Sequence, residues 1–385
     1  MHMPDDAYEA GLASYACRSD LSRGRLYKED NSPTRNPYQR DRDRIIHSTA
    51  FRRLEYKTQV FVNHEGDHYR TRLTHSIEVA QIARSICRAM GLHEDLAEAV
   101  ALAHDLGHTP FGHSGQDALN EVMQSYGGFE HNRQSLRIVE KLEQRYALFP
   151  GLNLSYETRE GIVKHTSPHD LPKNQDLSQY HLHQQATLEA QIGNLADEIA
   201  YNNHDIDDGI RAGMLSVESL QDTELFRMHY AAVVEAYPDA RDRVRVPETI
   251  RSMINFLILD AIEETGRHIC EAEVMTLDDV RTAEQPLVGF SRQVRHMNGE
   301  LKRYLYEHMY KHYRVVRMAM KAERVIKALF SAYMETPSML PPGAQLKKEN
   351  SELEQARAVA DYIAGMTDRY ALDEYDRLFS IHART

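Results

Sequence analysis

Apolar residues recur along most of the chain at spacings of three and four positions, which is typical of amphipathic helices. The strongest pattern lies in residues 72–90, whose predicted buried stripe consists of Ile77, Val79, Ala80, Ile82, Ala83 and Ile86. Other helices are predicted at residues 42–60, 96–106, 116–123, 132–148, 157–164, 188–205, 247–274, 299–332, 351–366 and 372–379. Strand-like sequence is confined to residues 60–62. The sequence therefore predicts an all-α protein.

Polar segments rich in turn-forming residues divide this helical pattern into four parts. Residues 1–40 are predicted to form a polar, basic arm, and residues 41–215 a helical core. A helical extension follows at residues 216–335, and residues 336–385 comprise a Pro-rich linker and the C-terminal helices. Within the core, residues 166–185 are rich in Pro, Ser, His and Gln, and we expect them to form a loop or lid.

The charge of the chain is acidic overall but uneven. A net charge of -12 argues against a dedicated nucleic-acid coat or a membrane-surface protein. Between Arg18 and Arg53, however, ten Lys or Arg residues stand against five acids, a local balance of +5. This segment has two interpretations of equal weight, a solvated and partly disordered arm or an anion-binding segment.

Cysteine usage and hydropathy indicate the cellular compartment in which the protein is expected. The three cysteines, Cys17, Cys87 and Cys270, are far apart and include no CxxC pair, which fits a reducing cytosol without disulfides. The N-terminus lacks the basic-then-apolar pattern of a signal peptide, and no apolar run approaches the length of a membrane span. We therefore expect a soluble, cytoplasmic protein with no membrane partner.

A polar cluster follows the apolar run at residues 92–103. His104, Asp105, His108 and His113 lie within ten residues, with Gly107 and Pro110 between them. Gly107 is expected to end the helix in a left-handed conformation, which leaves His104 and Asp105 in the last turn and His108 and His113 on the following loop. Imidazole and carboxylate together suit divalent cations such as Mn, Fe, Mg or Zn. A lone His-Asp pair, however, is more often a helix-terminal pair stabilised by the helix dipole.

Two further polar residues interrupt apolar helices elsewhere. His75 precedes the apolar stripe of the 72–90 helix, and Asp197 lies inside an apolar stretch of the 188–205 helix. A buried carboxylate is costly unless it is paired or bound to a metal. Asp197, Tyr201 and Asp205 share one face of their helix because they are four residues apart. His75, His104, Asp105 and Asp197 could therefore converge from three helices, although each alone also fits a core or ion-paired residue.

Longer motifs surround these residues and resemble the HD-domain deoxynucleoside triphosphate triphosphohydrolases, which include the bacterial dGTPases. They are Phe51–Gln59, Thr-His-Ser-Ile-Glu-Val from residue 74, the His104–His113 stretch, and Ala-Asp-Glu-Ile-Ala-Tyr from residue 196. The resemblance is clear over about residues 40–215 and weaker in the C-terminal third. It implies an HD-domain helical bundle with additional C-terminal helices.

The resemblance also implies the residues of a metal-dependent site. The residues that match the metal ligands are His75, His104, Asp105 and Asp197. The implied cofactor is a divalent ion, namely Mn, Mg or Fe, which Zn or Ni could replace in a crystal. Arg72 matches an arginine that contacts the α-phosphate, and Lys164 matches a phosphate-binding lysine. The residues that match pocket histidines near the phosphates are His108, His113 and His131.

Four more residues match contacts to the sugar. Gln59 and Asp205 match residues that hold the 3′-hydroxyl, and Tyr201 matches a tyrosine that packs on the sugar where a ribose 2′-hydroxyl would intrude. Tyr310 corresponds to a further sugar-gating tyrosine. Two departures from the pattern concern Gln116, which replaces an acid found in several relatives, and Glu198, which replaces a phosphate-binding lysine of the vertebrate enzyme.

The resemblance predicts hydrolysis of a dNTP between the 5′-oxygen and the α-phosphorus, giving deoxynucleoside and tripolyphosphate. The metal, Arg72, Lys164 and protonated histidines would neutralise the triphosphate, and His113 or His131 would be the general acid. Alternatives are an HD phosphohydrolase acting on a dNMP, a cyclic nucleotide or an alarmone, or a single-strand nucleic-acid binding protein or exonuclease. Relatives also imply a homo-oligomer, tetramer or hexamer, with contacts from residues 216–335, which would also complete the pocket. They imply dNTP activators at an allosteric site as well; weak single-stranded DNA binding is a further possible partner interaction.

Overall fold

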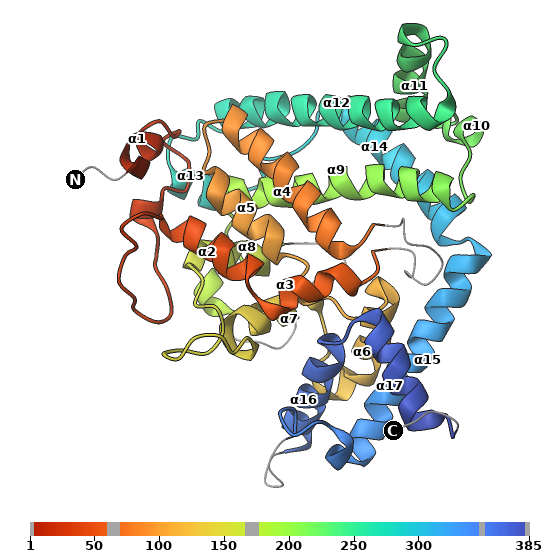
Figure 1. The fold of residues 1–385 in the computed structure, drawn as a ribbon. Coiled ribbons are helices and arrows are strands. Elements are labelled where there is room, and N and C mark those ends of the chain that lie inside the picture. Colours follow the sequence, from red (N-terminus) through yellow and green to blue (C-terminus); the bar gives the residue numbers. More distant parts are fainter. Residues whose placement is uncertain (1–3, 60–69, 166–176, 346–350, 382–385) are drawn as a thin grey trace.

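Helices form all the regular structure that the computed structural model describes (Figure 1), which comprises residues 4–59, 70–165, 177–345 and 351–381. The first nine are α1 Pro4–Ala10, α2 Pro37–Ile46, α3 Thr49–Arg53, α4 Arg72–Ala89, α5 Glu94–Ala103, α6 Gly112–Val122, α7 His131–Arg137, α8 Tyr156–Val163 and α9 Leu188–Arg211. The others are α10 Val217–Leu220, α11 Glu224–Ala236, α12 Asp242–Glu271, α13 Leu277–Thr282, α14 Arg292–Leu305, α15 Tyr313–Glu335, α16 Glu352–Ala364 and α17 Asp368–Phe379. The all-α prediction is confirmed; residues 60–62 and 166–176 lie outside the described ranges.

The centre of the fold is the packing of α4 against α5 and α9. Helix α4 begins with a reciprocal capping box between Thr71 and Thr74, and most of its predicted stripe is buried against these two neighbours. Ile77 is the exception because 52% of it is exposed. Helix α12 lies across the bundle above α4 and α9 (Figure 1). The apolar faces of these helices therefore fix the positions from which α4, α5 and α9 present polar residues.

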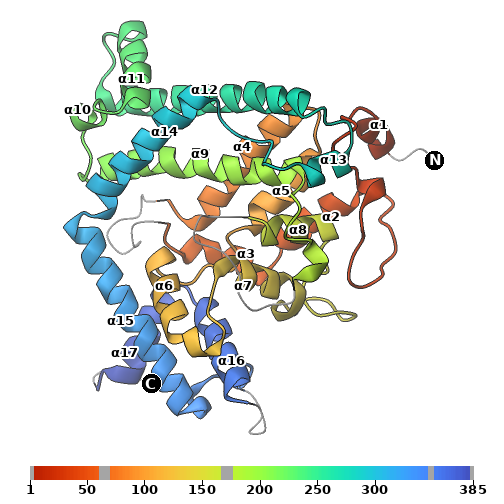
Figure 2. The ribbon, with the colours of Figure 1, turned by 180° about the vertical axis from the view of Figure 1, so that it is seen from behind.

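A second apolar cluster joins the C-terminal helices to α6. Helix α15 packs along α6 and also contacts α16 and α17, and both views place these helices at the same end of the molecule (Figures 1 and 2). The predicted single helix 299–332 is wrong, because a π-helical turn at Tyr306–Tyr310 separates α14 from α15. This turn bends the chain where Tyr310 meets α9.

Other predicted boundaries also shift where local capping overrides apolar spacing. The 42–60 helix is divided into α2 and α3, since the side chain of Ser48 caps a new helix by accepting a hydrogen bond from the Phe51 amide. The 132–148 helix ends in a π-helical turn at Ile138–Leu142. The 116–123 helix begins earlier, at Gly112. The last change moves His113 from the predicted loop into the first turn of α6.

The basic N-terminal segment is folded onto the core. Arg25 pairs with Asp41 at 2.5 Å, and Arg44 pairs with Glu29 at 2.7 Å. Arg18, Arg35, Arg40 and Arg42 also form ion pairs with acids. Because most of its arginines are paired, the described part of this segment offers little unpaired charge to an external anion. None of the described helices combines the length and the apolar character that crossing a membrane requires.

Replacing buried Lys57 with methionine is expected to change how stability depends on pH. Burial, Arg53 and Arg72 lower the pKa of Lys57 to about 7, whereas a lysine in an unfolded chain has a pKa of about 10.4. Between these values the unfolded chain holds one more proton, so the free energy of unfolding rises with pH by up to about 1.4 kcal/mol per unit. Lys57→Met removes this rise.

Urea titrations between about pH 7 and about pH 9 measure the effect. Lys321, exposed on α15, supplies the matched Lys→Met control, which should keep the wild-type slope. Equal pH slopes in wild type and Lys57→Met would contradict the expectation.

Candidate functional site

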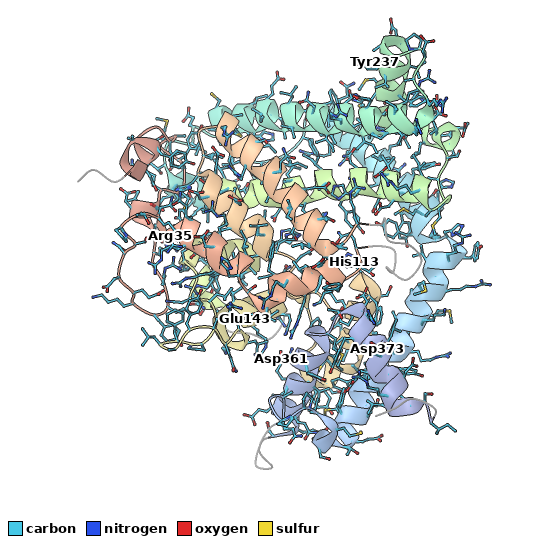
Figure 3. All side chains as sticks on the ribbon, in the orientation of Figure 1. Arg35, His113, Glu143, Tyr237, Asp361 and Asp373 are labelled. Carbon is cyan, nitrogen blue, oxygen red and sulfur yellow. The ribbon has the colours of Figure 1, made fainter. Side chains whose placement is uncertain are left out.

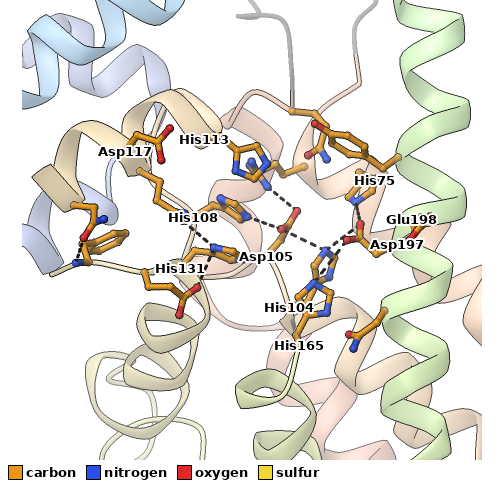
Figure 4. A pocket seen from close by; sticks show the side chains of 18 of the residues that line it. His75, His104, Asp105, His108, His113, Asp117, His131, His165, Asp197 and Glu198 are labelled. Carbon is orange, nitrogen blue, oxygen red and sulfur yellow. Dashed lines mark hydrogen bonds and ion pairs between the residues drawn. The ribbon is translucent and has the colours of Figure 1, made fainter. Parts of the chain in front are cut away.

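A cavity of about 1140 Å³ opens between α4, α6, α7, α9 and the π-helical turn before α15. Most of the residues predicted to act in the site line it. They are Gln59, Arg72, His75, His104, Asp105, His108, His113, His131, Asp197, Tyr201, Asp205 and Tyr310. Their places range from position 59 to position 310, so the fold brings distant parts of the sequence to one cavity (Figure 4).

The four predicted metal ligands lie together at the base of this cavity. His75 on α4 places its Nε2 atom 2.7 Å from Asp197 Oδ1 on α9. His104 caps the end of α5, and its Nε2 atom lies 3.3 Å from Asp105 Oδ1 and 3.8 Å from Asp197 Oδ1. All but Asp197 are almost fully buried; 28% of the Asp197 side chain is exposed, towards the cavity. Two overlapping groups, His75–His104–Asp105 and His104–His165–Asp197, each have their ligand atoms within 4.8 Å of one another, which fits a divalent cation that is reached from the cavity.

The hydrogen bond at His104 Nδ1, the ring nitrogen that faces away from the cluster, tests whether the cluster fits a divalent cation. His104 Nδ1 donates to the carbonyl oxygen of Ala101 at 2.6 Å, which leaves a lone pair on Nε2. Among the described residues, this buried Nε2 has no hydrogen-bond partner. A lone pair directed at two carboxylates is unfavourable unless a cation lies between them. A metal ligand needs this tautomer, so the residues present fit a divalent ion.

Strong local charges keep both carboxylates ionised. Burial raises the pKa of Asp105, but Arg72, with Nη1 at 2.9 Å, and the neighbouring histidines outweigh it, so the pKa stays well below the usual range. The pKa of Asp197 is also lowered, since its hydrogen bond with His75 outweighs the effect of burial. The site therefore offers two anionic oxygen ligands at neutral pH.

Close backbone packing shapes the turn after Asp105. Gly107 is not left-handed, contrary to the sequence prediction; instead, an added Cβ would lie 2.2 Å from the His131 carbonyl oxygen. Glycine is needed here because α7 approaches too closely for any side chain. The left-handed residues are Phe111 and Gly112, at φ 64° and 60°.

Two pocket histidines stack beside this turn. The His108 and His131 rings lie 4.0 Å apart, and His108 Nε2 lies 3.1 Å from Asp105 Oδ1. His131 Nδ1 lies 2.8 Å from Gln116 Oε1, so Gln116 orients the His131 ring. Gln116 stands where several relatives carry an acid, which would have been expected to act on His113. Burial lowers the pKa of both histidines well below 6.5. Both are therefore neutral at pH 7, which removes them from the protonated histidines expected to neutralise the substrate.

The sugar-contact residues meet on the other side of the cluster. Asp205 and Tyr201 lie on α9, and the Tyr310 hydroxyl donates a hydrogen bond to Asp205. The Tyr310 and Tyr201 hydroxyl oxygens are 2.5 Å apart. Burial raises the pKa of Asp205 well above its usual range. Along α9, Tyr201 and Asp205 follow Asp197 by about one and two helical turns.

Lys164 is the predicted contact that the structure does not bring to the cavity. Its ammonium lies 2.8 Å from Glu160 Oε1 and 3.3 Å from the Gln185 carbonyl oxygen. It is absent from the lining of the cavity as far as the described residues show, whereas the next residue, His165, does line it. The described structure thus gives no support to Lys164 as a phosphate contact.

Sequence reasoning missed the residues that support this cluster. The His165 ring lies 5.1 Å from that of His104, and its Nε2 atom is 3.7 Å from Asp197 Oδ2. Behind His75, His204 Nδ1 lies 3.3 Å from His75 Nδ1, and His204 Nε2 lies 2.5 Å from Glu78 Oε2. In the sequence, His165 follows Lys164 and His204 precedes Asp205. These positions next to predicted site residues could have indicated both histidines.

Comparison with known proteins defines the class. Residues 72–202 match the HD domain model, and residues 288–377 match the model of a phosphohydrolase-associated domain. The chain is 55% identical over 374 residues to a deoxyguanosinetriphosphate triphosphohydrolase-like protein of Thiobacillus denitrificans, covering 97% of this chain and 98% of that protein. It is 56% identical over 376 residues to the protein of that name from Ralstonia pickettii, covering 97% and 96%. This HD-domain phosphohydrolase therefore belongs to the family of deoxyguanosinetriphosphate triphosphohydrolase-like proteins.

Proposed function

We propose that the protein hydrolyses deoxynucleoside triphosphates, dGTP or several dNTPs, to deoxynucleoside and tripolyphosphate. One observation carries this proposal: the His104–Asp105–Asp197 cluster and the Tyr201–Asp205–Tyr310 group lie in one cavity, with Tyr201 about one and Asp205 about two helical turns from Asp197 along α9. The cluster suits a metal at the α-phosphate, and the tyrosine and carboxyl group suits a sugar. The name of the relatives, which specifies deoxyguanosine triphosphate, agrees with this substrate class.

The chemistry divides between the metal and the side chains. When bound by His75, His104, Asp105 and Asp197, a divalent ion supplies an acidic water and withdraws charge from an α-phosphate oxygen. A water oxygen attacks the α-phosphorus, the bond to the 5′-oxygen breaks, and the 5′-oxygen takes a proton from His113. His131, held by Gln116, is the competing donor, but its buried ring is neutral at pH 7 and would first have to take up a proton on Nε2 when the anionic substrate binds. His108 orients the Asp105 carboxylate. Arg72, fixed by Asp105, binds the α-phosphate through its guanidinium.

Sugar selection depends on the group beside the metal cluster. Gln59 and Asp205 bind the 3′-hydroxyl, and Tyr201 packs on the sugar ring. The short distance between the Tyr201 and Tyr310 hydroxyls leaves little room for a 2′-hydroxyl, which supports a preference for deoxynucleotides. Lys302 lines the cavity and pairs with the Glu198 carboxylate at 3.0 Å. The position of Lys302 supports it better than Lys164 as the cation that contacts the outer phosphates.

Tyr310→Ala is expected to weaken discrimination against ribonucleotides. Removing the ring opens the space beside Tyr201, so the ratio of kcat/KM for a dNTP to that for the matching NTP should fall about tenfold or more. Tyr27→Ala is the control because Tyr27 is 41% exposed, lies outside the proposed oligomer contact and does not line the cavity. Steady-state assays with dGTP and GTP measure the ratio. An unchanged ratio in a folded Tyr310→Ala variant would remove Tyr310 from sugar selection.

Assembly and location complete the proposal. We propose a cytoplasmic homo-oligomer, tetramer or hexamer, that forms through residues 216–335 and binds dNTPs as activators. Exposed apolar side chains on this segment support the contact, namely Leu259, Tyr313, Val316 and Met320. Light scattering at the assay concentration tests it, and a monomeric mass with and without dNTPs would contradict it.

Product analysis is the decisive test of the activity. The protein is incubated with each dNTP, alone and in mixtures, with Mg²⁺ or Mn²⁺ and with a chelator as control. Deoxynucleoside and tripolyphosphate are the expected products. Release of dNMP and pyrophosphate would show that the scissile bond is assigned wrongly. Hydrolysis of only a dNMP, cyclic nucleotide or alarmone would reassign the substrate, and salt-sensitive binding of single-stranded DNA without nucleotide turnover would replace the enzyme proposal.

A further inference from the structure

One buried carboxylate connects the C-terminal helices to the HD core. Asp368 begins α17, and only 3% of it is exposed. Its Oδ1 atom accepts a hydrogen bond from the Phe111 amide at 2.8 Å. Its Oδ2 atom accepts from the Thr58 amide at 2.9 Å and also from the Thr58 hydroxyl. Asp368 therefore holds two segments of the core that are far apart in the sequence.

Both segments carry residues of the cavity. Thr58 directly precedes Gln59, and Phe111 lies between His108 and His113. Phe111 has a φ of 64°, a conformation that L-residues with a bulky side chain rarely adopt and that the surrounding structure must hold. The hydrogen bond from its amide to Asp368 supplies part of that restraint. The segments also touch, since an added Cβ on Gly112 would lie 3.3 Å from the Gln59 carbonyl oxygen.

Two further contacts from the C-terminal helices reach the backbone that carries the pocket histidines. Lys57 Nζ donates to the His108 carbonyl at 2.5 Å and to the Ala364 carbonyl, at the end of α16, at 2.8 Å. Asp361 on α16, labelled in Figure 3, accepts from Gln134 at 3.0 Å and pairs with an arginine of α7, the helix that begins with His131. The C-terminal helices thus contact the turn before α6 and α7 together.

We propose that Asp368 is a positioning residue that sets the placement of His113 relative to Gln59, so that the C-terminal helices form part of the catalytic machinery. The roles of His113 and Gln59 rest on the proposed function, whereas the contacts of Asp368 do not. The hydrogen bonds of Asp368 to the described residues go to Thr58 and Phe111 and not to α4, α5 or α9, which carry the proposed metal ligands. Its loss should therefore affect turnover and the turn at Phe111 while leaving metal affinity unchanged.

Asp368→Ala in the full chain tests this, with Asp373→Ala as the matched control. Asp373 lies on the same helix (Figure 3), and 54% of its side chain is exposed. For Asp368→Ala, we expect kcat to fall about 10- to 100-fold, in keeping with a small misplacement of catalytic groups. Mn²⁺ affinity, measured by calorimetry, should stay within about twofold of wild type. If Asp368 only stabilised the whole site, Mn²⁺ affinity would fall as well. Hydrogen exchange at the Phe111 amide should accelerate. Asp373→Ala should match wild type in all three.

Asp368→Asn keeps the proposal falsifiable if the alanine variant does not fold. It preserves side-chain size but retains only one acceptor oxygen, so kcat and Phe111 protection should fall to intermediate values. A folded variant with wild-type kcat and wild-type exchange would overturn the proposal, and so would a loss of Mn²⁺ affinity equal to the loss of kcat. If the wild-type protein hydrolyses no nucleotide, the proposed function fails separately, and Phe111 exchange alone decides whether Asp368 holds the turn.

Discussion

Asp197→Ala is expected to weaken Mn²⁺ binding by more than about 100-fold, since loss of a ligand exceeds the usual effect of losing a residue that supports one. Metal-dependent turnover should disappear with it. The Asp197 carboxylate lies close to both His75 and His104, at 2.7 Å and 3.8 Å from their Nε2 atoms. Its removal takes one negative charge and one oxygen ligand from the cluster. Calorimetry with Mn²⁺ and product chromatography measure the two effects.

Glu198→Ala is the matched control for metal binding. Glu198 is adjacent on α9, but its carboxylate pairs with Lys302 at 3.0 Å and not with the cluster. Its removal should leave Mn²⁺ affinity unchanged. If Asp197→Ala binds Mn²⁺ as wild type does and remains active, the four-residue metal site is wrong.

Arg72→Gln is expected to lower kcat about 100- to 1000-fold, which is the usual cost of losing one donor that stabilises transition-state charge. Only 2% of Arg72 is exposed, and its guanidinium lies at the cavity beside Asp105. Mn²⁺ should bind at least as tightly, because a neighbouring positive charge is gone. This combination of weaker turnover and undiminished metal binding distinguishes Arg72 from a ligand.

The control for Arg72→Gln is Arg88→Gln. Arg88 lies at the other end of α4, has 68% of its side chain exposed and pairs with Glu94. It should retain wild-type kcat. Parallel loss of metal binding and activity in Arg72→Gln would mean that Arg72 acts by holding Asp105 and not by binding phosphate.

Spacing along single helices was enough to predict much of the cavity. His75 precedes an apolar stripe on its helix, Asp197 interrupts one, and Tyr201 and Asp205 share a helix face with Asp197. The motifs around His104 supplied the rest through resemblance. What failed were boundaries and local conformations, because the π-helical turn at Tyr306–Tyr310 and the left-handed Phe111 depend on contacts with distant helices.

Pairing of charges across the fold was not visible in the sequence either. Lys164 is followed by His165, and spacing alone gave no reason to prefer the second for the cavity. The choice is made by Glu160, one turn earlier on α8, which engages the lysine ammonium. No pattern in the sequence singled out Asp368. Its role depends on Thr58 and Phe111, 310 and 257 positions away.

Helix α9 runs without interruption past both halves of the cavity and fixes the distance between them. Asp197, Tyr201 and Asp205 are four residues apart on one continuous helix, so successive members are separated by about 6 Å along its axis. No loop intervenes whose length could change this interval. In the proposed mechanism, a change in sugar preference would therefore come from replacing side chains such as Tyr201 or Tyr310, while the interval itself stays the same.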